Sequence, residues 1–353
     1  MININGNYLE GGGQIVRTAL ALSAITGKSF EVYDIRKGRK DSGLKAQHLY
    51  CIKSLEQLCN AKTEGAELGS TYLKFEPGKL KAKDIEIDIG TAGSITLLLQ
   101  SLLLPCFFVD RKIKLTIKGG TDVSWSMPFD YFRNVFIPHA DTFCSKLNVN
   151  LMRRGHYPKG GGMVEIDIKP KYKLSDFKTF EEFYNSLKNE TNKINLADRG
   201  QLTKIKGISN ATKSLEKANV AERQSSAAKS ILKKYNCPID ILSEYCDSYS
   251  DGSAIVLWAV FKNAVIGADC LGERGKKAEI VGEEAAKKLA EEINSGAAVD
   301  EHLADNLIPF LGLFGGKIKT SKISSHTLTN IYVVEKFLDV KFNIDEKEKI
   351  ISI

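Results

Sequence analysis

The sequence predicts a mixed α/β fold of the α+β type, built from three similar units and a smaller α/β insert. Three observations support this prediction. The chain has 353 residues, enough for two or three structural units at about 150 residues each. Its composition, 43% hydrophobic and 26% charged, is that of a globular protein and excludes wholesale disorder. A glycine-rich loop followed by helical and β-like segments recurs at roughly 80–90 residues, which indicates a repeated domain.

The first unit opens with YLEGGGQIVRTALALSAITG (8–27), a glycine loop that leads into a helix. The apolar residues Ile15, Ala19 and Leu22 recur at helical spacing and predict a buried face. The alternating run 30–35 then predicts a strand. A basic loop and a second helix over 46–58 complete the unit.

The second and third units follow the same order. The second has a loop at 89–94 and then predicted elements in the order helix 95–104, strand 112–117 and helix 127–147. The third begins near Leu271-Gly272-Glu273-Arg274-Gly275 and continues with helices 278–294 and 301–311, strand 316–321 and helix 328–337.

A different module lies between the second and third units. The polar stretch 171–197 reads as an exposed helix or linker. It is followed by predicted elements in the order strand 202–208, helix 214–235, and strands 254–261 and 264–270 joined by a Lys262-Asn263 turn. We therefore expect a repeated core over 1–197 and 273–353, with an inserted α/β domain over 198–272.

Charge and targeting signals narrow the class of protein. The net charge of +7 fits a polyanionic partner such as RNA, although many enzymes without one have a similar charge. The seven cysteines form no CxxC pair, which argues against a zinc ribbon or thioredoxin motif and favours free thiols in a reducing cytosol. No signal peptide or apolar run of about 20 residues is present, so we expect a cytoplasmic protein without a membrane partner.

Two N-terminal loops suit phosphate binding. In Glu10-Gly11-Gly12-Gly13-Gln14, glycines at a helix start allow backbone N–H groups to approach an anion. Glu10 there is suited to a divalent cation that arrives with a nucleotide. The basic loop Arg36-Lys37-Gly38-Arg39-Lys40 is a candidate phosphate clamp. The alternatives are a tight turn with a solvent-facing Glu10 for the first loop and a solvated run of charges for the second.

Two later loops are also candidates. Arg154-Gly155-His156-Tyr157-Pro158-Lys159-Gly160-Gly161-Gly162 has more glycine than a hairpin turn needs, which favours a functional role. In Ser324-Ser325-His326-Thr327, hydroxyls cap a helix whose positive end is expected to lower the pKa of His326. A neutral His326 would have a ring nitrogen free to attack an electrophile, whereas a capping or core histidine is the alternative. HExxH and GxSxG motifs are absent, so metalloprotease and serine hydrolase functions have no support.

In this order, the loops resemble those of the RNA 3′-terminal phosphate cyclases. RGHYPKGGGMV is similar to that family's signature, and EGGGQIVRTALALSAITG, GTAGSITLLLQ, GGTDVSWSMP and SSHTLTNI look like further family landmarks. The similarity spans essentially the whole chain. It implies three βαβαββ units akin to the C-terminal domain of translation initiation factor three, with the insert before the third unit.

The resemblance also implies a reaction. His326 matches the histidine that attacks the α-phosphate of ATP to form histidine–AMP. The AMP then passes to an RNA 3′-phosphate, and the vicinal 2′-OH closes a 2′,3′-cyclic phosphate. Mg²⁺ or Mn²⁺ is the expected metal. Such an enzyme is a ligase that forms a phosphoric ester and acts in RNA processing.

The remaining site residues follow from the same resemblance. They are Gln100 and Pro128 in an adenine pocket, Asp305 and Asn306 near the nucleotide, Arg17, Arg39 and Gln47 at the phosphates or RNA end, and Glu10 at the metal or phosphates. His302 stands where the family has an aromatic stacking residue, and Asn306 where glutamine is usual. Imidazole can stack, so ATP use is still expected, while preference for adenine over guanine is open.

Three other functions remain as alternatives. A non-catalytic cyclase-like ribosome-assembly factor would lack the nucleophilic histidine, which is present here. An enolpyruvyl-shikimate-phosphate synthase has a related repeated architecture but needs no covalent nucleotide. A pure RNA-binding module would bind no nucleotide covalently. The open sheet edges of such a fold would also suit a homodimer.

Overall fold

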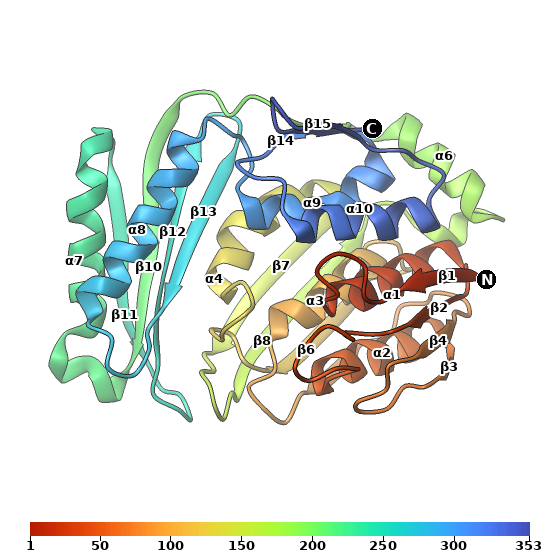
Figure 1. Ribbon diagram of the computed structural model, residues 1–353, viewed down its shortest axis with the longest axis horizontal. Coiled ribbons are helices and arrows are strands. Elements are labelled where there is room, and N and C mark those ends of the chain that lie inside the picture. Colours follow the sequence, from red (N-terminus) through yellow and green to blue (C-terminus); the bar gives the residue numbers. More distant parts are fainter.

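The computed structural model describes residues 1–353 and contains four four-stranded sheets. Three of the sheets belong to a core that occupies the right of Figure 1, and the fourth lies in an insert on the left. Helices and sheets alternate in the mixed α/β arrangement that the sequence predicted, with both parallel and antiparallel strand pairs. No helix is both long and apolar enough to cross a membrane.

The first unit has the order βαβαββ. Its elements are β1 (Ile2–Asn5), α1 (Gln14–Thr26), β2 (Phe30–Tyr33), α2 (Ala46–Cys59), β3 (Lys62–Glu64) and β4 (Leu73–Glu76). The sheet order is β1-β2-β4-β3, with β1 and β2 parallel. Every residue of α1 is buried because this helix packs between α2, α3 and α10.

The second unit repeats this order. Its elements are β5 (Ile85–Asp88), α3 (Ile95–Cys106), β6 (Ile113–Gly119), a helical segment of α4 (Phe129–Tyr131), η1 (Phe132–Phe136), α5 (Ile137–Ala140) and η2 (Asp141–Phe143), then β7 (Cys144–Arg153) and β8 (Gly162–Pro170). Helix α3 is apolar on nearly all sides, as expected of a buried helix. The predicted helix over 127–147 is too long, because residues from Cys144 onward pair with β8 as a strand.

The third unit is interrupted. After the short helices η3 (Leu174–Asp176) and α6 (Phe180–Glu190), it consists of β9 (Ile194–Leu196), α9 (Glu301–Phe314), β14 (Gly316–Lys319), α10 (Ser325–Phe337), β15 (Asn343–Asp345) and β16 (Ile350–Ser352). Strand β9 pairs in parallel with β14 although the whole insert separates them in the chain. The insert therefore enters the third unit after its first strand and does not precede it.

The insert has its own sheet and core. It comprises β10 (Leu202–Thr212), η4 (Lys213–Ala218), α7 (Val220–Leu232), η5 (Lys233–Tyr235), β11 (Ile239–Cys246), β12 (Ser253–Phe261), β13 (Val265–Leu271) and α8 (Ala278–Asn294). Helix α8, which we predicted to open the third repeated unit, packs on α7, β12 and β13. Its apolar face joins the 16 residues of the insert's core, whereas 72 residues, nearly all from the three units, form the main core. Strand β11 was not predicted.

Candidate active site

His326 lies in the first turn of α10, and a buried network fixes that turn. The Ser324 hydroxyl caps the helix by accepting a hydrogen bond from the Thr327 N–H, 2.9 Å away, as the sequence predicted. The hydroxyls of Ser324 and Thr327 donate to Asp305 Oδ1 at 2.7 and 2.6 Å. The His326 side chain itself is 47% exposed. The network holds the backbone rigidly while leaving the imidazole open to a ligand.

The Glu10 loop contacts one ring nitrogen of His326. Nδ1 lies 2.5 Å from Glu10 Oε2 and 2.5 Å from Gln14 Oε1, and a single N–H bonds to one of them at a time. The Gln14 amide also donates to the His326 carbonyl at 3.3 Å. Nε2 has no hydrogen-bond partner. A proton held on Nδ1 leaves the Nε2 lone pair available, which is the form of imidazole that acts as a nucleophile.

The prediction that the helix start lowers the pKa of His326 is wrong. The hydrogen bond to Glu10 raises that pKa above its ordinary value, and the charge of Glu10 adds to this effect against partial burial. The Glu10 carboxylate itself is half-buried, which opposes ionisation, but its bonds to His326 and Arg39 outweigh burial and lower its pKa. For the pKa of His326, contact with a carboxylate therefore outweighs burial of the ring and the charge of Arg17.

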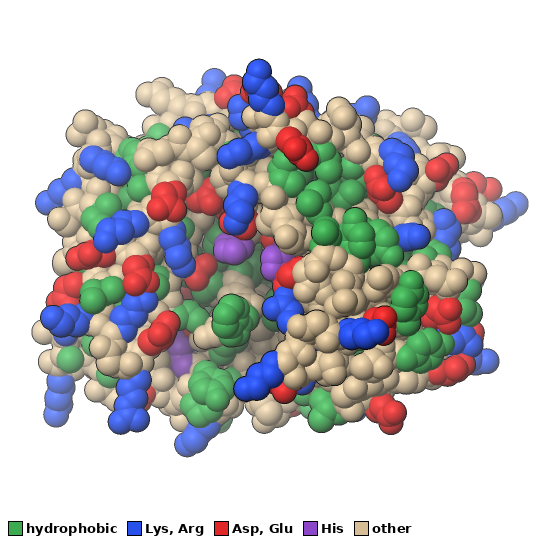
Figure 2. Space-filling view, viewed as in Figure 1, with side chains coloured by type: hydrophobic (Ala, Val, Ile, Leu, Met, Phe, Trp, Pro, Cys, Tyr) green, Lys and Arg blue, Asp and Glu red, His purple; other side chains and the backbone are tan.

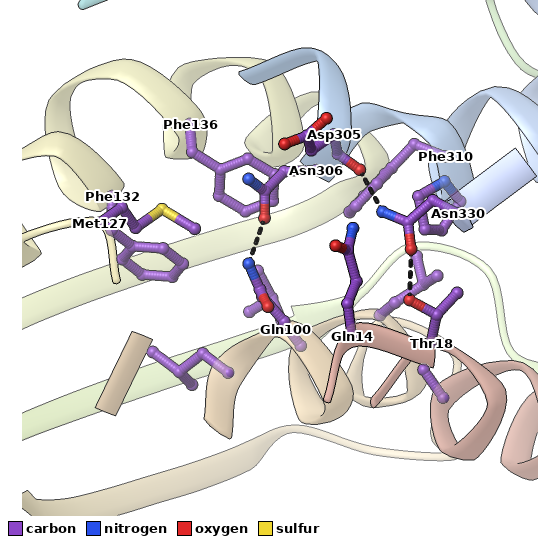
Figure 3. A pocket seen from close by; sticks show the side chains of 15 residues that line it. Gln14, Thr18, Gln100, Met127, Phe132, Phe136, Asp305, Asn306, Phe310 and Asn330 are labelled. Carbon is purple, nitrogen blue, oxygen red and sulfur yellow. Dashed lines mark hydrogen bonds between the residues drawn. The ribbon is translucent and has the colours of Figure 1, made fainter. Parts of the chain in front are cut away.

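A chain of polar side chains runs from α1 to α9. The buried Arg17 donates through Nε to Gln100 Oε1 at 2.9 Å. Gln100 Nε2 in turn donates to Asn306 Oδ1 at 2.9 Å (Figure 3). Burial lowers the pKa of Arg17. Arg39 forms an ion pair with Glu10. Arg17 and Arg39 therefore supply positive charge on the side of the site formed by the first unit.

Gln100 and Asn306 line a pocket between α1, α3, α9 and α10 (Figure 3). Its polar edge includes Gln14, Gln100, Asp305 and Asn306, and its apolar wall includes Met127, Phe132, Phe136 and Phe310. A concave site with an apolar wall and a few converging polar groups is typical of sites for a small ligand with an aromatic ring. All three repeated units contribute residues to it.

The other predicted residues lie at the margin. Pro128 caps α4 directly after the pocket residue Met127. The ring of His302 lies 6.4 Å from that of Tyr131, and its carbonyl accepts a hydrogen bond from Asn306 at 2.7 Å. Gln47 is half-buried in the first turn of α2 and forms no side-chain hydrogen bond. The structure thus brings Glu10, Arg17, Arg39, Gln100, Asp305, Asn306 and His326 together more closely than Pro128, His302 and Gln47.

Three polar residues of the site were missed. Gln14 contacts His326, and the Thr18 hydroxyl donates to Asn330 Oδ1 at 2.7 Å while the Asn330 amide donates to the Asp305 carbonyl at 2.6 Å. Gln14 and Thr18 are four residues apart in a largely apolar helix, and Asn330 follows His326 by four. Because residues at i and i+4 share a helix face, this spacing was a readable signal.

No group of three or more His, Cys, Asp or Glu side chains is arranged to hold a metal ion. Glu10 is the carboxylate in contact with His326. One carboxylate together with ligand phosphates is a common Mg²⁺ arrangement, since this ion retains several waters. The donor set therefore suits a metal carried by a nucleotide better than a permanently bound one.

Comparison with known proteins shows the family. A family model described as RNA 3'-terminal phosphate cyclase matches residues 8–344. A protein of that name from Pyrococcus furiosus is 45% identical over 99% of this chain and 98% of its own. Its namesakes from Thermococcus gammatolerans and Saccharolobus islandicus are 43% and 42% identical over 98% of this chain and 94% and 97% of their own. The chain belongs to the RNA 3'-terminal phosphate cyclase family of enzymes.

Proposed function

We propose that this protein converts an RNA 3′-phosphate into a 2′,3′-cyclic phosphate at the expense of ATP, with His326 as the nucleophile. The observation that supports this most is the state of the His326 ring. Nδ1 lies against Glu10 and Gln14, Nε2 is free, and the pocket with Gln100 and Asn306 lies beside it. Such an arrangement suits a reaction that begins with attack by a ring nitrogen.

In the first step, Nε2 attacks the α-phosphorus of ATP. An N–P bond forms, the bond between the α-phosphorus and its bridging oxygen breaks, and pyrophosphate leaves. The Nδ1 proton stays within the contact to Glu10, whose negative charge stabilises the positive charge that develops on the ring. Arg17 and Arg39 balance negative charge on the phosphates.

In the second step, an oxygen of the RNA 3′-phosphate attacks the phosphorus of the adenylate. The N–P bond breaks, His326 is regenerated, and a mixed anhydride joins the RNA to AMP. In the third step the 2′-oxygen, losing its proton, attacks the RNA phosphorus and AMP leaves. Dividing one condensation into these exchanges makes each barrier smaller. Gln47, near the Arg39 loop, is the proposed contact to the RNA end.

The pocket supports ATP as the substrate. Gln100 and Asn306 now bond each other and can turn their amide groups toward the edge of the base. Pro128, at the start of α4, and His302, in the first turn of α9, are candidate stacking surfaces. Asp305 stabilises the turn that carries His326. Mg²⁺ or Mn²⁺, with Glu10 as its protein ligand, would neutralise phosphate charge when bound. A cytoplasmic location and a homodimer remain our predictions.

The alternative of a non-catalytic ribosome-assembly factor has less support. Such a role needs neither the nucleophile nor the contacts that orient it, yet Glu10, Gln14 and Ser324 hold His326 with its free nitrogen exposed. A protein without this chemistry would have no need for these contacts.

The test uses an RNA oligonucleotide with a labelled 3′-phosphate, ATP, and Mg²⁺ or Mn²⁺. We expect the label to become resistant to phosphatase and to migrate as a 2′,3′-cyclic end. His302→Ala serves as a histidine control that keeps this activity at raised ATP concentration, whereas His326→Ala abolishes it. Unchanged, phosphatase-sensitive RNA with folded protein and either metal would contradict the proposal.

A further inference from the structure

Three exposed aromatic side chains, two from loops of the second unit and one from the insert, lie outside the His326 network. Trp125 is 97% exposed, Tyr157 75% and Tyr249 56%. Side chains of this size are costly to leave in water, and a group of them indicates a surface that is covered by a ligand. We call Trp125, Tyr157 and Tyr249 the aromatic platform.

The platform is assembled from three loops that contact one another. Asp122 and His156 form a β-bridge that joins the Trp125 and Tyr157 loops. The Lys159 N–H donates to Ser250 Oγ at 3.1 Å, which joins the Tyr157 loop to the insert loop that carries Tyr249. In Figure 1 the loop after β7 lies beside the loop between β11 and β12. The three aromatic residues therefore occupy one region.

A buried ion network makes this region rigid. Arg154, only 4% exposed, bonds Asp130 at 2.7 Å, Asp122 at 3.3 Å and Glu244 of β11 at 2.5 Å. Three acidic partners, from a loop, helix α4 and the insert, thus converge on one guanidinium. A surface held in place before binding loses little conformational entropy when a ligand arrives.

The backbone of Trp125 is strained. Its φ of 66° lies in the left-handed region, which a bulky residue rarely adopts. Neither the main core nor its neighbours explain the conformation, since the side chain makes almost no contact with the protein. Strain of this kind persists mostly where it presents a side chain to a ligand.

Cations accompany the aromatic rings. The guanidinium of Arg153 lies 4.5 Å from the centre of the Tyr249 ring, and its Nε donates to the Gly161 carbonyl at 2.6 Å. Lys159 is exposed between Tyr157 and the insert. Figure 2 shows exposed hydrophobic side chains beside Lys and Arg side chains near the lower ends of the insert and core. Aromatic faces with adjacent cations bind unpaired bases and the phosphates between them.

Two short segments of chain connect the platform to the pocket. Trp125 precedes the pocket residue Met127 by two positions, and Gly160 packs against Thr91 and Ala92 in the loop that opens α3, the helix that carries Gln100. A ligand that reached from the pocket to the platform would have to be longer than a single nucleotide, as an RNA strand is.

We propose that the aromatic platform binds the unpaired nucleotides upstream of the RNA 3′-phosphate by stacking their bases on Trp125 and Tyr157. Tyr249 and Arg153 form the adjoining surface that contacts the backbone. This inference rests on the proposed function for the direction of the RNA, but the binding surface can be tested without any catalytic step.

The experiment measures binding of a ten-nucleotide single-stranded RNA with a 3′-phosphate, in the absence of ATP. The chain has two tryptophans, and Trp258 is only 8% exposed, so quenching by a small polar quencher reports mainly on Trp125. We expect the RNA to change Trp125 emission and to protect it from the quencher. A blunt RNA duplex, whose bases are already stacked, should do neither.

Substitutions separate stacking from charge and folding. Trp125→Ala and Tyr157→Ala should each weaken RNA binding roughly tenfold, and Trp125→Phe should retain most of it, since loss of one base stack typically costs about 1–3 kcal/mol. Tyr72→Ala removes an exposed tyrosine that directly precedes β4 in the first unit and should leave binding unchanged. Covalent labelling by ATP should be the same in all four variants.

Two results would overturn the inference. One is RNA binding that is equal in wild type, Trp125→Ala and Tyr157→Ala. The other is equal protection of Trp125 by single-stranded and duplex RNA. If instead the protein fails to cyclise RNA but the platform variants still weaken RNA binding, the proposed function fails and the binding surface stands.

Discussion

The loops at residues 10–14 and 154–162 are alike in sequence but serve different purposes in the structure. Each contains three consecutive glycines; the buried His48 packs beside the first loop, and the buried His156 belongs to the second. A Cβ at Gly13 would lie 1.9 Å from His48 Nε2, and one at Gly161 would lie 2.3 Å from the Tyr249 ring. In both loops, glycine allows close approach of a ring.

The two loops differ in their charged groups. The first presents Glu10 to the half-exposed His326, so its charge can act on a ligand. The second directs Arg154 inward to three carboxylates, and its outer surface carries aromatic side chains. A glycine-rich sequence thus indicates only that another group packs closely against the backbone. The neighbouring charged residues decide whether the loop takes part in catalysis or holds segments of the fold together.

The largest expected effect is the loss of chemistry in the first region. His326→Ala should fold with an unchanged melting temperature, because the ring is half-exposed and Ser324 still caps α10. It should lose adenylylation entirely, since no other group replaces the nucleophile. A gel assay with ATP labelled at the α-phosphate measures this, and retained labelling would assign the nucleophile elsewhere.

In the second region, the expected loss is of stability. Arg154→Met leaves the buried Asp122 and Asp130 without their cation, which should lower the free energy of unfolding by about 3–5 kcal/mol. Urea denaturation measures the change, and protein that remains folded at low temperature should still be adenylylated. If folded Arg154→Met lost adenylylation, or if its stability were unchanged, the second loop would not have the purely structural role that distinguishes it from the first.

The buried histidine of the first region should make the protein sensitive to acid. Burial, with help from Arg17 and Arg36, lowers the pKa of His48 to about 3 from its ordinary 6.5. Below an unfolded-state pKa of 6.5 only the unfolded chain binds this proton, so stability falls as the pH drops toward 3. At about pH 5 the loss should be on the order of 2 kcal/mol relative to neutral pH.

His48→Asn provides the control for this pH effect. Asn Oδ1 can replace Nδ1 as the acceptor for the Lys45 N–H, which bonds it at 2.9 Å, but it does not titrate. The urea midpoint of the variant should therefore change less between neutral pH and about pH 5. An equally steep change in both proteins would assign the acid sensitivity to other groups.

The smallest expected effect concerns the polar chain beside the pocket. Gln100→Ala removes the hydrogen bonds to Arg17 and Asn306, and hydrogen bonds to charged groups contribute about 1.5–3 kcal/mol. Because we propose that the same amide turns toward the base edge, we expect the KM for ATP to rise roughly tenfold. Loss of the contact to the buried Arg17 should also lower the melting temperature by a few degrees. Initial rates of labelling at varied ATP concentration measure this, and an unchanged KM would exclude Gln100 from nucleotide binding.

Local patterns in the sequence were sufficient for many of the core elements. The apolar runs of α1 and α3 and the hydroxyl cap before His326 predict their helices because propensity, burial and capping all agree there. The family resemblance then located Glu10, Gln100, Asp305 and Asn306 beside His326.

The errors came from interactions between distant segments. An amphipathic pattern predicts that α8 is a helix but not which sheet it covers, and three-residue β9 is defined only by its partner β14. The pKa of His326 depends on Glu10, which no local pattern near position 326 reveals. Gln14 and Asn330 were visible as polar residues at helical spacing, but their partners lie on other helices.

The most direct test of the account is to locate the covalent nucleotide. The protein is incubated with ATP and Mg²⁺ or Mn²⁺, digested without acid, and its peptides are analysed by mass spectrometry before and after addition of RNA with a 3′-phosphate. We predict one AMP on Nε2 of His326 that disappears when the RNA is added. An AMP adduct on any other residue, or one on His326 that RNA does not remove, would contradict the account.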